Sequence, residues 1–468
     1  MSGLLLPVIR RPSSLISTGS VVRNLKSPQQ LVQSQSHHLH YSSRLMSAKL
    51  KPAARVAGNR QDVWTIVNEA AAASPRQPIV NMGQGFFGYN PPEFILNAAK
   101  KALDRVECNQ YSPTRGRPRL RKALSKAYAP HWGRELDPET EITITTGANE
   151  GMLSAFMAFI EPGDEVIVFE PFFDQYISNI EMPGGKIVYV PMHPPKDGHI
   201  KTLSASEWTI DFDELERAVS PRTKMLVINT PHNPVGKVFS RAELERIADL
   251  CVKNQIIILS DEVYDRLFYT PFTRMATLSP EVEKITLTVG SAGKNFYATG
   301  WRVGWLMGPA DLIQYVAAAH TRICYSSVSP LQEACAIGFE EADQQGFWTQ
   351  CIDDMQSKMS RFNAIWDELG LPYSIPEGGY FVMANLNKVE IPEGYPFPPH
   401  VAERPRDFKL AYFLIQELGV AAIPPSEFYT EANAHIVEDW LRFAVCKPDE
   451  VLEDAKERLR GLKKFIKQ

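Results

Sequence analysis

The sequence lacks any uninterrupted apolar run of the roughly 18–20 residues that a membrane-crossing helix needs, so a soluble protein with no membrane partner is predicted. Its first 61 residues contain no acidic residue, although nine of the 50 Lys and Arg residues lie there. All 54 acidic residues therefore belong to the rest of the chain, which is mildly acidic. Nucleic-acid binders carry a basic surface, so this charge balance argues against a nucleic-acid partner.

Cysteine is scarce and scattered, with six residues and no CxxC pair in the sequence. Neither a disulfide framework nor a metal site is predicted from this spacing, and a reducing compartment is expected. Hydrophobic residues make up 44% and charged residues 22% of the 468 residues, so the chain can build a substantial core. Wholesale disorder is thereby excluded.

Residues 1–60 have the composition of a targeting leader. The first fifty residues contain eleven serines and several arginines, and they begin with a short apolar stretch that ends at Pro7. This Arg- and Ser-rich, acid-free composition is typical of a mitochondrial presequence, whereas a secretory signal would need a longer apolar region. A disordered tail without targeting function is the alternative. Met46 offers a second start, which would give an additional cytoplasmic form.

Short β-rich runs alternate with amphipathic segments beyond Asp62, which predicts an α/β fold. Some runs are apolar throughout, as expected for strands covered on both faces, and helical patterns separate most of them. The large domain should therefore contain a mostly parallel seven-stranded sheet flanked by helices, with ligands bound beyond the carboxyl ends of the strands. The strands are expected at residues 142–146, 165–169, 186–190, 224–229, 255–259, 285–289 and 303–307.

The strand signal thins after about residue 310, where long helical patterns dominate and predict a smaller α+β domain. A proline-rich stretch at 387–405 is expected to be a surface loop, and helices are expected at 408–418 and 449–465. The predicted organisation is a leader at 1–60, an N-terminal segment at 62–93 that packs with the small domain, a large domain at 94–345 and the small domain at 346–468.

A glycine motif near the start of the body imitates a dinucleotide-binding loop. Gly83, Gly85 and Gly88 fit GxGxxG, and Asp104 follows at about the expected distance. The third glycine should open a helix, but Tyr-Asn-Pro-Pro follows it, and Asp104 falls within a helical pattern. A nucleotide-dependent dehydrogenase is therefore disfavoured. A loop that a ligand or another segment approaches closely is predicted instead.

Two turns after predicted strands could bind a ligand. The run 142–151 passes from a strand through small residues into a helix, where free backbone N–H groups, such as those of Ala148 and Asn149, could bind an anion. Taken alone, an ordinary turn between strand and helix is the better interpretation. Asn233 lies between two prolines that constrain its loop, and for this segment a plain turn is equally plausible.

Two further strand ends carry reactive side chains. Asp261 and Tyr264 follow the most apolar run of the sequence, where a carboxylate needs a cation or a strong donor. A helix-capping aspartate is the simpler reading. Lys294 follows the next strand in a Ser- and Gly-rich turn, eight residues before Arg302. Desolvation there would make it an amine nucleophile, although most lysines are merely exposed.

The order of these motifs is more informative than any one of them. TGAN, NTPHNP, SDEVY, SAGK and GWRVGW follow one another with 28 residues from Asn233 to Asp261 and 33 from Asp261 to Lys294. This arrangement resembles the class I/II aminotransferases of fold type I, which depend on pyridoxal 5′-phosphate, and the resemblance covers residues 62–468. The runs NMGQGF, EPFFDQY, NTPHNPVGKVFS and GSAGKNFYATGWRVGW resemble the kynurenine–oxoglutarate transaminase and glutamine transaminase K family, which includes cysteine-S-conjugate β-lyases.

The resemblance implies roles for individual residues around the cofactor. Lys294 would hold the cofactor aldehyde and move a proton, Asp261 would keep the pyridine nitrogen protonated, and Tyr264 would complete the catalytic set. Asn233 would join Tyr264 at the ring oxygen. The remaining cofactor contacts implied by the family are Phe173, stacked on the ring, and Ala148, Asn149, Ser291 and Arg302 at the phosphate, with Tyr111 reaching that phosphate from the other subunit of a homodimer.

The substrate site follows from the same resemblance. Arg442 would bind the substrate α-carboxylate with a two-pronged pair, and Gly85 and Asn233 would complete that site. Trp64 would line the side-chain pocket, although it could equally anchor the N-terminal segment to the core. The chain departs from the family at Ser327-Val328-Ser329-Pro330, where many members carry an aromatic–His pair before the proline. An altered pocket wall is therefore expected.

The expected activity is transfer of the amino group of an aromatic or sulfur-containing amino acid, with kynurenine as the leading candidate, to a 2-oxo acid such as 2-oxoglutarate. Kynurenic acid would then form from kynurenine. The alternatives on the same site are cysteine-S-conjugate β-lyase activity and glutamine or methionine transamination. A non-catalytic relative is disfavoured because Asp261, Lys294 and Arg442 are all present.

Overall fold

The computed structural model describes residues 52–56 and 62–467. The chain divides into two units, Met1–Gly58 and Asn59–Gln468, and the sheets and the cavity belong to the second. In the first unit the described residues include a short 3-10 helix at Ala54–Val56. The predicted leader otherwise lies outside the described residues.

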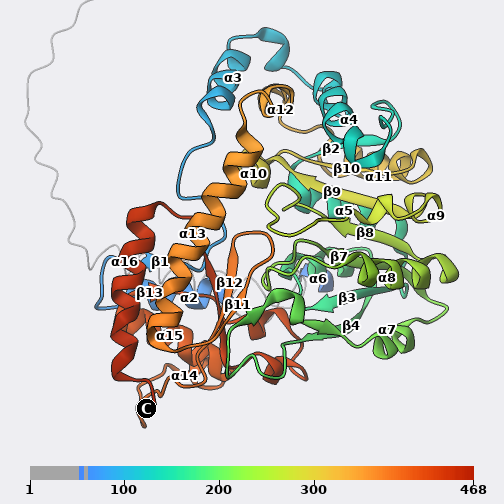
Figure 1. Ribbon diagram of the computed structural model, residues 1–468. Coiled ribbons are helices and arrows are strands. Elements are labelled where there is room, and N and C mark those ends of the chain that lie inside the picture. The colour runs from blue at the N-terminus through green and yellow to red at the C-terminus, as the bar shows by residue number, and fades with distance from the viewer. Residues whose placement is uncertain (1–51, 57–61, 468) are drawn as a thin grey trace, which may run out of the picture. The chain divides into compact units, whose positions relative to one another are not determined.

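The second unit is organised around a mixed sheet that has eight strands within the described residues (Figure 1). Their order across the sheet is β2-β10-β9-β8-β7-β3-β4-β6. β10 runs antiparallel to both neighbours, and β6 pairs antiparallel with β4, whereas the other neighbouring pairs are parallel. The strands are β2 (Ile142–Thr145), β3 (Glu165–Glu170), β4 (Lys186–His193), β6 (Thr209–Ile210), β7 (Thr223–Asn229), β8 (Ile257–Asp261), β9 (Thr286–Ser291) and β10 (Gly304–Met307).

This arrangement confirms the mostly parallel α/β sheet, and all seven predicted strands are present. The predicted number of strands is wrong by one, because β6 adds a short antiparallel edge. β6 has only two residues, so it carries no apolar run or alternation from which it could be recognised. Every residue of β8 is buried, which agrees with the continuous apolar pattern expected of a central parallel strand.

Helices cover the sheet, and their ends show why the sequence folds this way locally. Helix α8 begins with a capping box in which Ser240 and Glu243 satisfy each other's backbone N–H groups, and it ends at Gln255 in the left-handed conformation. The helices are α2 (Val63–Ala73), α3 (Glu93–Leu103), α4 (Pro118–Trp132), α5 (Gly147–Phe159), α6 (Asp174–Glu181), α7 (Phe212–Ala218), α8 (Arg241–Asn254), α9 (Pro280–Glu283), α10 (Ala292–Asn295), α11 (Ala310–Cys324), α12 (Ser329–Glu341), α13 (Phe347–Leu369), α14 (Pro399–Ala402), α15 (Arg406–Leu418) and α16 (Asp449–Leu459).

A second, four-stranded sheet has the order β14-β12-β11-β5, and β1 and β13 form a parallel pair of their own. α13, α15 and α16 lie beside these strands in Figure 1. The predicted C-terminal helices are present, but α16 gives way to a 3-10 helix at Arg460–Lys464. These strands are β1 (Val80–Asn81), β5 (Leu203–Ser204), β11 (Tyr373–Ile375), β12 (Phe381–Asn385), β13 (Val420–Ala421) and β14 (Trp440–Ala444).

The proline-rich stretch 387–405 includes the short helix α14 and is held by aromatic packing. The ring of Tyr395 lies 5.0 Å from Phe397 and 5.0 Å from Phe413 of α15, and its hydroxyl donates to Glu417 at 2.8 Å. Val401 of the same stretch is fully buried. The stretch is therefore anchored to α15 by its own side chains.

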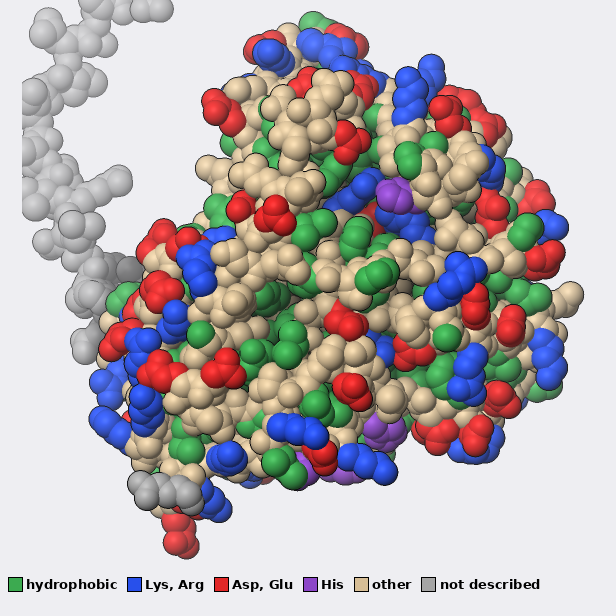
Figure 2. All heavy atoms as spheres, viewed as in Figure 1, with side chains coloured by type: hydrophobic (Ala, Val, Ile, Leu, Met, Phe, Trp, Pro, Cys, Tyr) green, Lys and Arg blue, Asp and Glu red, His purple; other side chains and the backbone are tan. Residues whose placement is uncertain are grey.

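Figure 2 shows acidic and basic side chains interspersed over the visible face of the molecule. No helix in the part of the chain that the structure describes combines the length and apolar character needed to span a bilayer.

Candidate active site

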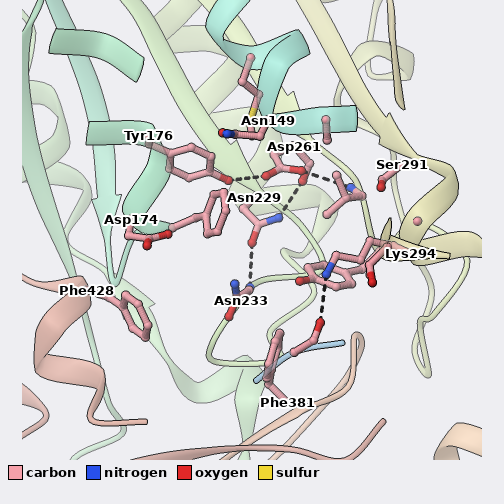
Figure 3. Close-up of a pocket in the computed structure, with 18 of the residues that line it drawn as sticks. Asn149, Asp174, Tyr176, Asn229, Asn233, Asp261, Ser291, Lys294, Phe381 and Phe428 are labelled. Carbon is pink, nitrogen blue, oxygen red and sulfur yellow. Dashed lines mark hydrogen bonds between the residues drawn. The ribbon is translucent and has the colours of Figure 1, made fainter. Parts of the chain in front are cut away.

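A cavity of about 270 Å³ opens at the carboxyl edge of the large sheet, where β7, β8 and β9 end (Figure 3). This is the position expected for a ligand of a parallel sheet. Twelve of the thirteen residues predicted for the site line this one cavity. They are Trp64, Gly85, Ala148, Asn149, Phe173, Asn233, Asp261, Tyr264, Ser291, Lys294, Arg302 and Arg442.

Lys294 projects into the cavity from the short helix α10, directly after β9. Its Nζ donates to the Tyr380 hydroxyl at 2.6 Å and to the Gly85 carbonyl oxygen at 3.2 Å. Tyr380 in turn donates to the same carbonyl oxygen at 2.7 Å. Burial lowers the pKa of the amine to about 8, outweighing the opposing influence of Cys446 and Asp261. Lys294 is therefore an oriented amine that is easily deprotonated.

Asp261 ends strand β8 and is buried, with 4% of its surface exposed. Tyr176 donates its hydroxyl to one carboxylate oxygen, and the Val263 backbone N–H donates to the other at 3.3 Å. Burial nevertheless raises the pKa of Asp261 to about 6. An ionised carboxylate here is costly unless a cation faces it, which fits the predicted pairing with a protonated ring nitrogen.

Asn233 is held in the loop after β7. Its backbone N–H donates to Asn229 Oδ1 at 2.7 Å, and the Asn229 side chain donates to the Asp261 carbonyl oxygen at 2.9 Å. The ends of β7 and β8 are thus tied together, which fixes the direction of Asn233. Tyr264 lies near it, buried, with its ring 5.3 Å from that of Tyr380, and burial raises the pKa of its phenol. Tyr264 is therefore a neutral hydrogen-bonding group.

The opposite end of the cavity is suited to an anion. Ala148 and Asn149 lie in the first turn of α5, where backbone N–H groups are free of helical partners. The Arg302 guanidinium lies over Gly147, so close that a Cβ at Gly147 would come within 2.5 Å of Nη2. Glycine is therefore needed at that position, which also has a φ of +79°. Ser291 is the last residue of β9, and its side chain accepts no hydrogen bond from the backbone of α10.

Arg442 reaches the cavity from the small sheet, in the middle of β14. It donates from Nη1 to Asn233 Oδ1 at 3.1 Å and from Nη2 to the Gly83 carbonyl oxygen at 2.9 Å. Burial lowers the pKa of this guanidinium to about 10. These two acceptors are neutral oxygens, so a substrate carboxylate would give the guanidinium a direct ionic partner.

Aromatic rings surround Arg442 and form an apolar wall. The guanidinium carbon lies 4.4 Å from the centre of the Phe381 ring, 5.2 Å from that of Phe428 and 5.8 Å from that of Trp64. The Trp64 indole N–H donates to Asp174 Oδ2 at 3.3 Å, and both residues line the cavity. Trp64 lines the cavity and also packs against the core, and a carboxylate lies beside it.

The glycine loop is not a phosphate-binding loop. Gly83 and Gly85 present carbonyl oxygens to Arg442 and Lys294, the opposite of the N–H groups that would bind a pyrophosphate. The glycines are needed because other chain segments approach closely: a Cβ on Gly85 would come within 2.5 Å of Phe381, and one on Gly88 within 2.4 Å of Pro448. The prediction of a closely approached loop is confirmed.

Tyr111 is the predicted site residue that does not line the cavity. Its side chain is 83% exposed, and its ring lies 5.3 Å from that of Tyr325, which is also exposed. Residues 327–330, where an altered pocket wall was expected, do not line the cavity of their own chain either. Ser327 instead bonds within the protein, its carbonyl oxygen accepting from Ser112 at 3.2 Å and from Gln332 at 3.1 Å.

Several residues that position the predicted ones were not predicted from the sequence. Tyr176 orients Asp261, Tyr380 orients Lys294, and Asp174 bonds Trp64. Tyr176 could have been found, because it follows Phe173 by three residues in a helical segment and so lies on a similar face. Tyr380 follows a Gly-Gly pair, which signals only a turn.

Comparison with known proteins agrees with this site. The model of the family "Aminotransferase class I and II" matches residues 77–459. A probable kynurenine–oxoglutarate transaminase of Saccharomyces cerevisiae is 53% identical over 414 residues, covering 87% of this chain and 93% of that protein. A kynurenine–oxoglutarate transaminase of Dictyostelium discoideum is 36% identical, covering 90% and 98%. The crystal structure of a candidate kynurenine aminotransferase from Saccharomyces cerevisiae has a TM-score of 0.88 and 52% identity, covering 90% of this chain and all of the other.

Proposed function

The chain belongs to the aminotransferase class I and II family, and we propose that it uses pyridoxal 5′-phosphate to transfer the amino group of kynurenine to 2-oxoglutarate. The observation that carries this proposal is the convergence of Lys294, Asp261 and Arg442 on one cavity. The relatives of highest identity quoted above, which are named for the kynurenine–oxoglutarate reaction, support the choice of substrates.

The cavity fits the proposed cofactor at three separate groups. The Lys294 amine, with its lowered pKa, suits the aldehyde. The Asp261 carboxylate is buried with a raised pKa and suits a protonated ring nitrogen. The first turn of α5, with Arg302 beside it, suits the phosphate. When bound, the cofactor supplies a cationic ring that accepts electrons from the substrate Cα.

The side chains of the protein then have distinct tasks. Lys294 would be the base that removes the substrate Cα proton, and Tyr380 and the Gly85 carbonyl hold its Nζ in position. Asp261 would hold the ring nitrogen in its protonated form, and Tyr176 fixes the direction of that carboxylate. Arg442 binds the substrate α-carboxylate and so orients Cα toward Lys294.

The wall around Arg442 supports an aromatic substrate. Trp64, Phe381 and Phe428 offer faces on which an aryl side chain can pack. Asp174 lies among them, with one oxygen accepting from Trp64 and the other from the Gln175 backbone N–H at 3.0 Å. Each carboxylate oxygen has a second lone pair, which can accept a hydrogen bond from a ring amino group. Kynurenine has such an amino group on its ring.

Product analysis tests this function. Kynurenic acid should form from kynurenine only when 2-oxoglutarate is present, with one glutamate produced for each kynurenine consumed. Pyruvate and ammonia release from a cysteine S-conjugate without any 2-oxo acid would reveal β-lyase activity. If elimination were efficient and kynurenine turnover absent, the proposed function would be wrong, although the cofactor assignment would stand.

We infer further that the protein is a homodimer with shared active sites. Tyr111 is far more exposed than aromatic side chains usually are, and exposed apolar side chains lie on its own and adjoining segments. These side chains are Leu103, Val106, Ile323, Tyr325 and Val328. A second subunit covering this surface would bury them and could bring Tyr111 to the phosphate of the partner site.

We also propose that residues 1–60 direct the protein to mitochondria, which rests on their Arg- and Ser-rich, acid-free composition. A fluorescent fusion of the full chain should co-localise with mitochondria, and a fusion that starts at Met46 should be cytoplasmic. Identical localisation of the two fusions would refute this proposal.

A further inference from the structure

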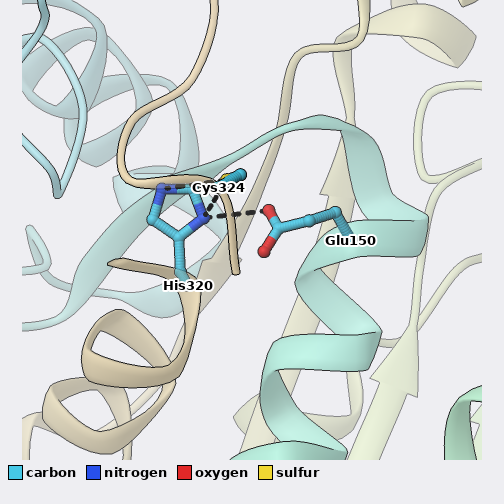
Figure 4. Close-up of side chains that lie close together, drawn as sticks. All are labelled: Glu150, His320 and Cys324. Atoms are coloured by element: carbon cyan, nitrogen blue, oxygen red, sulfur yellow. Dashed lines mark hydrogen bonds and ion pairs between the residues drawn. The ribbon is translucent and has the colours of Figure 1, made fainter. Parts of the chain in front are cut away.

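Three potential metal ligands meet behind the anion-binding turn, outside the cavity (Figure 4). Glu150 lies in the first turn of α5, and His320 and Cys324 lie four residues apart at the end of α11. The Nδ1 atom of His320 lies 2.9 Å from Glu150 Oε2 and 3.3 Å from Cys324 Sγ. The ligand atoms of the three residues all lie within 4.8 Å of one another. His320 is fully buried.

These groups are already linked to one another, because Nδ1 of His320 can donate to Glu150 while the Cys324 thiol lies within reach of the Thr146 hydroxyl. Nδ1 of His320 nevertheless faces the carboxylate and the sulfur together, so that the three ligand atoms point toward one another. A cation bound to the nitrogen, the carboxylate oxygen and the sulfur would satisfy all three groups at once. The hydroxyl of Thr146, 3.4 Å from Cys324 Sγ, offers a fourth oxygen.

We propose that Glu150, His320 and Cys324 form a binding site for a thiophilic divalent cation of the Zn²⁺ type. Mixed oxygen, nitrogen and sulfur sets are the ligands that Zn²⁺ prefers, and His and Cys four residues apart on one helix present both ligands to one side. On binding, the thiol releases one proton to solvent, and imidazole coordinates through Nδ1 with its proton on Nε2. The carboxylate and the thiolate then balance the two charges of the ion.

The position of the site links it to the proposed cofactor, and this part of the inference rests on the proposed function. The Glu150 oxygen that faces His320 also accepts the Thr146 backbone N–H at 2.8 Å. Thr146 directly precedes the turn that contains Gly147 and Ala148. A cation bound to that oxygen weakens its bond to Thr146 and so loosens the phosphate-binding turn. Occupancy of the metal site should therefore speed release of the cofactor.

No metal site is predicted from the sequence because the cysteines are scattered and form no CxxC pair. Here two ligands come from α11, and the third lies 170 residues earlier on the neighbouring helix. A His-x3-Cys pair alone is a common pattern and indicates nothing by itself. Only the packing of α11 against α5 brings the carboxylate to it.

Metal titration of the holoenzyme tests the site independently of catalysis. After dialysis against a chelator, the wild-type protein should bind one Zn²⁺ per subunit, measured by elemental analysis after gel filtration. Co²⁺ should give visible d–d bands at wavelengths longer than the cofactor absorption. Loss of a residue that only hydrogen-bonds to a metal ligand typically weakens metal binding by roughly 10–100-fold. Cys324→Ser removes a ligand itself, so it should weaken Zn²⁺ binding by more than this and should change the Co²⁺ bands.

Matched variants distinguish loss of a metal ligand from loss of any buried cysteine and from misfolding. Cys251→Ala removes another buried cysteine, on α8, and should keep wild-type Zn²⁺ binding. Glu150→Gln should weaken binding like Cys324→Ser, and circular dichroism should show that both variants fold. Absence of stoichiometric Zn²⁺, or equal binding by wild type and Cys324→Ser, would overturn the site. Unchanged cofactor release at full Zn²⁺ occupancy would overturn the link to the turn, while failure of the kynurenine assay would affect neither titration result.

Discussion

The Nη1 group of Arg442 donates to Asn233 Oδ1 at 3.1 Å and so connects the small sheet to the loop at the carboxyl edge of the large sheet. The geometry predicts that Arg442→Lys mainly impairs substrate binding, because lysine cannot make the two-pronged pair with a carboxylate. A charge-assisted hydrogen bond contributes about 1.5–3 kcal/mol, so KM for the amino acid should rise about 10–100-fold. Steady-state kinetics measure this, and the cofactor absorbance should be retained. Loss of that absorbance would contradict the assignment of Arg442 to the substrate.

Tyr380 is expected to act as a positioning residue for Lys294. Tyr380→Phe removes the hydroxyl 2.6 Å from Nζ, so the amine is held only by the Gly85 carbonyl and is less well oriented for proton transfer. We expect kcat to fall by about 10–100-fold, a part of the roughly 10²–10⁴-fold that a positioned base contributes, with KM nearly unchanged. A substrate deuterated at Cα should show a larger isotope effect in this variant. Phe87→Leu is the control for packing, because the Phe87 ring lies 5.1 Å from that of Tyr380 and does not line the cavity. An equal loss in that variant would argue against a specific role of the hydroxyl.

The lowered pKa of Lys294, about 8, predicts a pH dependence for cofactor uptake. Only the neutral amine attacks an aldehyde, so the rate of reconstitution should rise with pH and level off above about 8. An unperturbed lysine would continue to gain reactivity up to its usual pKa near 10.4. Stopped-flow absorbance of apoenzyme mixed with pyridoxal 5′-phosphate between pH 7 and 10 measures this rate. Nα-acetyl-lysine, whose side-chain amine is free and unperturbed, is the control. A rate that still rises at the upper end would show that burial does not activate this amine.

Much of the fold was predictable because its central strands are continuously apolar and are separated by helices. Asp261 and Lys294 could be found because they lie at the ends of such strands, Asp261 as the last residue of β8 and Lys294 shortly after β9. β6 was missed because two residues carry no pattern. Tyr176 and Tyr380 were missed because the sequence around a tyrosine that orients a catalytic group looks the same as the sequence around a tyrosine that packs in the core. Arg442 was assigned by resemblance alone, since nothing in its strand pattern indicates a cavity.

Shared active sites predict complementation between two defective variants. Lys294→Ala homodimers lack the essential amine, and Tyr111→Phe homodimers should hold the cofactor more weakly. A mixed dimer would contain one site with Lys294 from one subunit and Tyr111 from the other, so this site is wild type. Co-expressed subunits with different tags, purified as the mixed dimer, should bind the cofactor at one site with wild-type affinity.

If Tyr111 acted within its own subunit, no site of the mixed dimer would be wild type, and cofactor binding would stay as weak as in Tyr111→Phe. Analytical ultracentrifugation of the wild-type protein provides the control, because a monomer at micromolar concentration would contradict the dimer itself.

Covalent trapping of the cofactor tests the central claim most directly. The purified protein should be incubated with pyridoxal 5′-phosphate, reduced with borohydride and digested, and the modified peptide identified by mass spectrometry. We predict one phosphopyridoxyl group per chain, attached to Lys294 and absent from Lys294→Ala, while the buried Lys237, which pairs with Glu243 at 2.9 Å, stays unmodified. Attachment to another lysine, or no modification of the wild-type protein, would contradict the account.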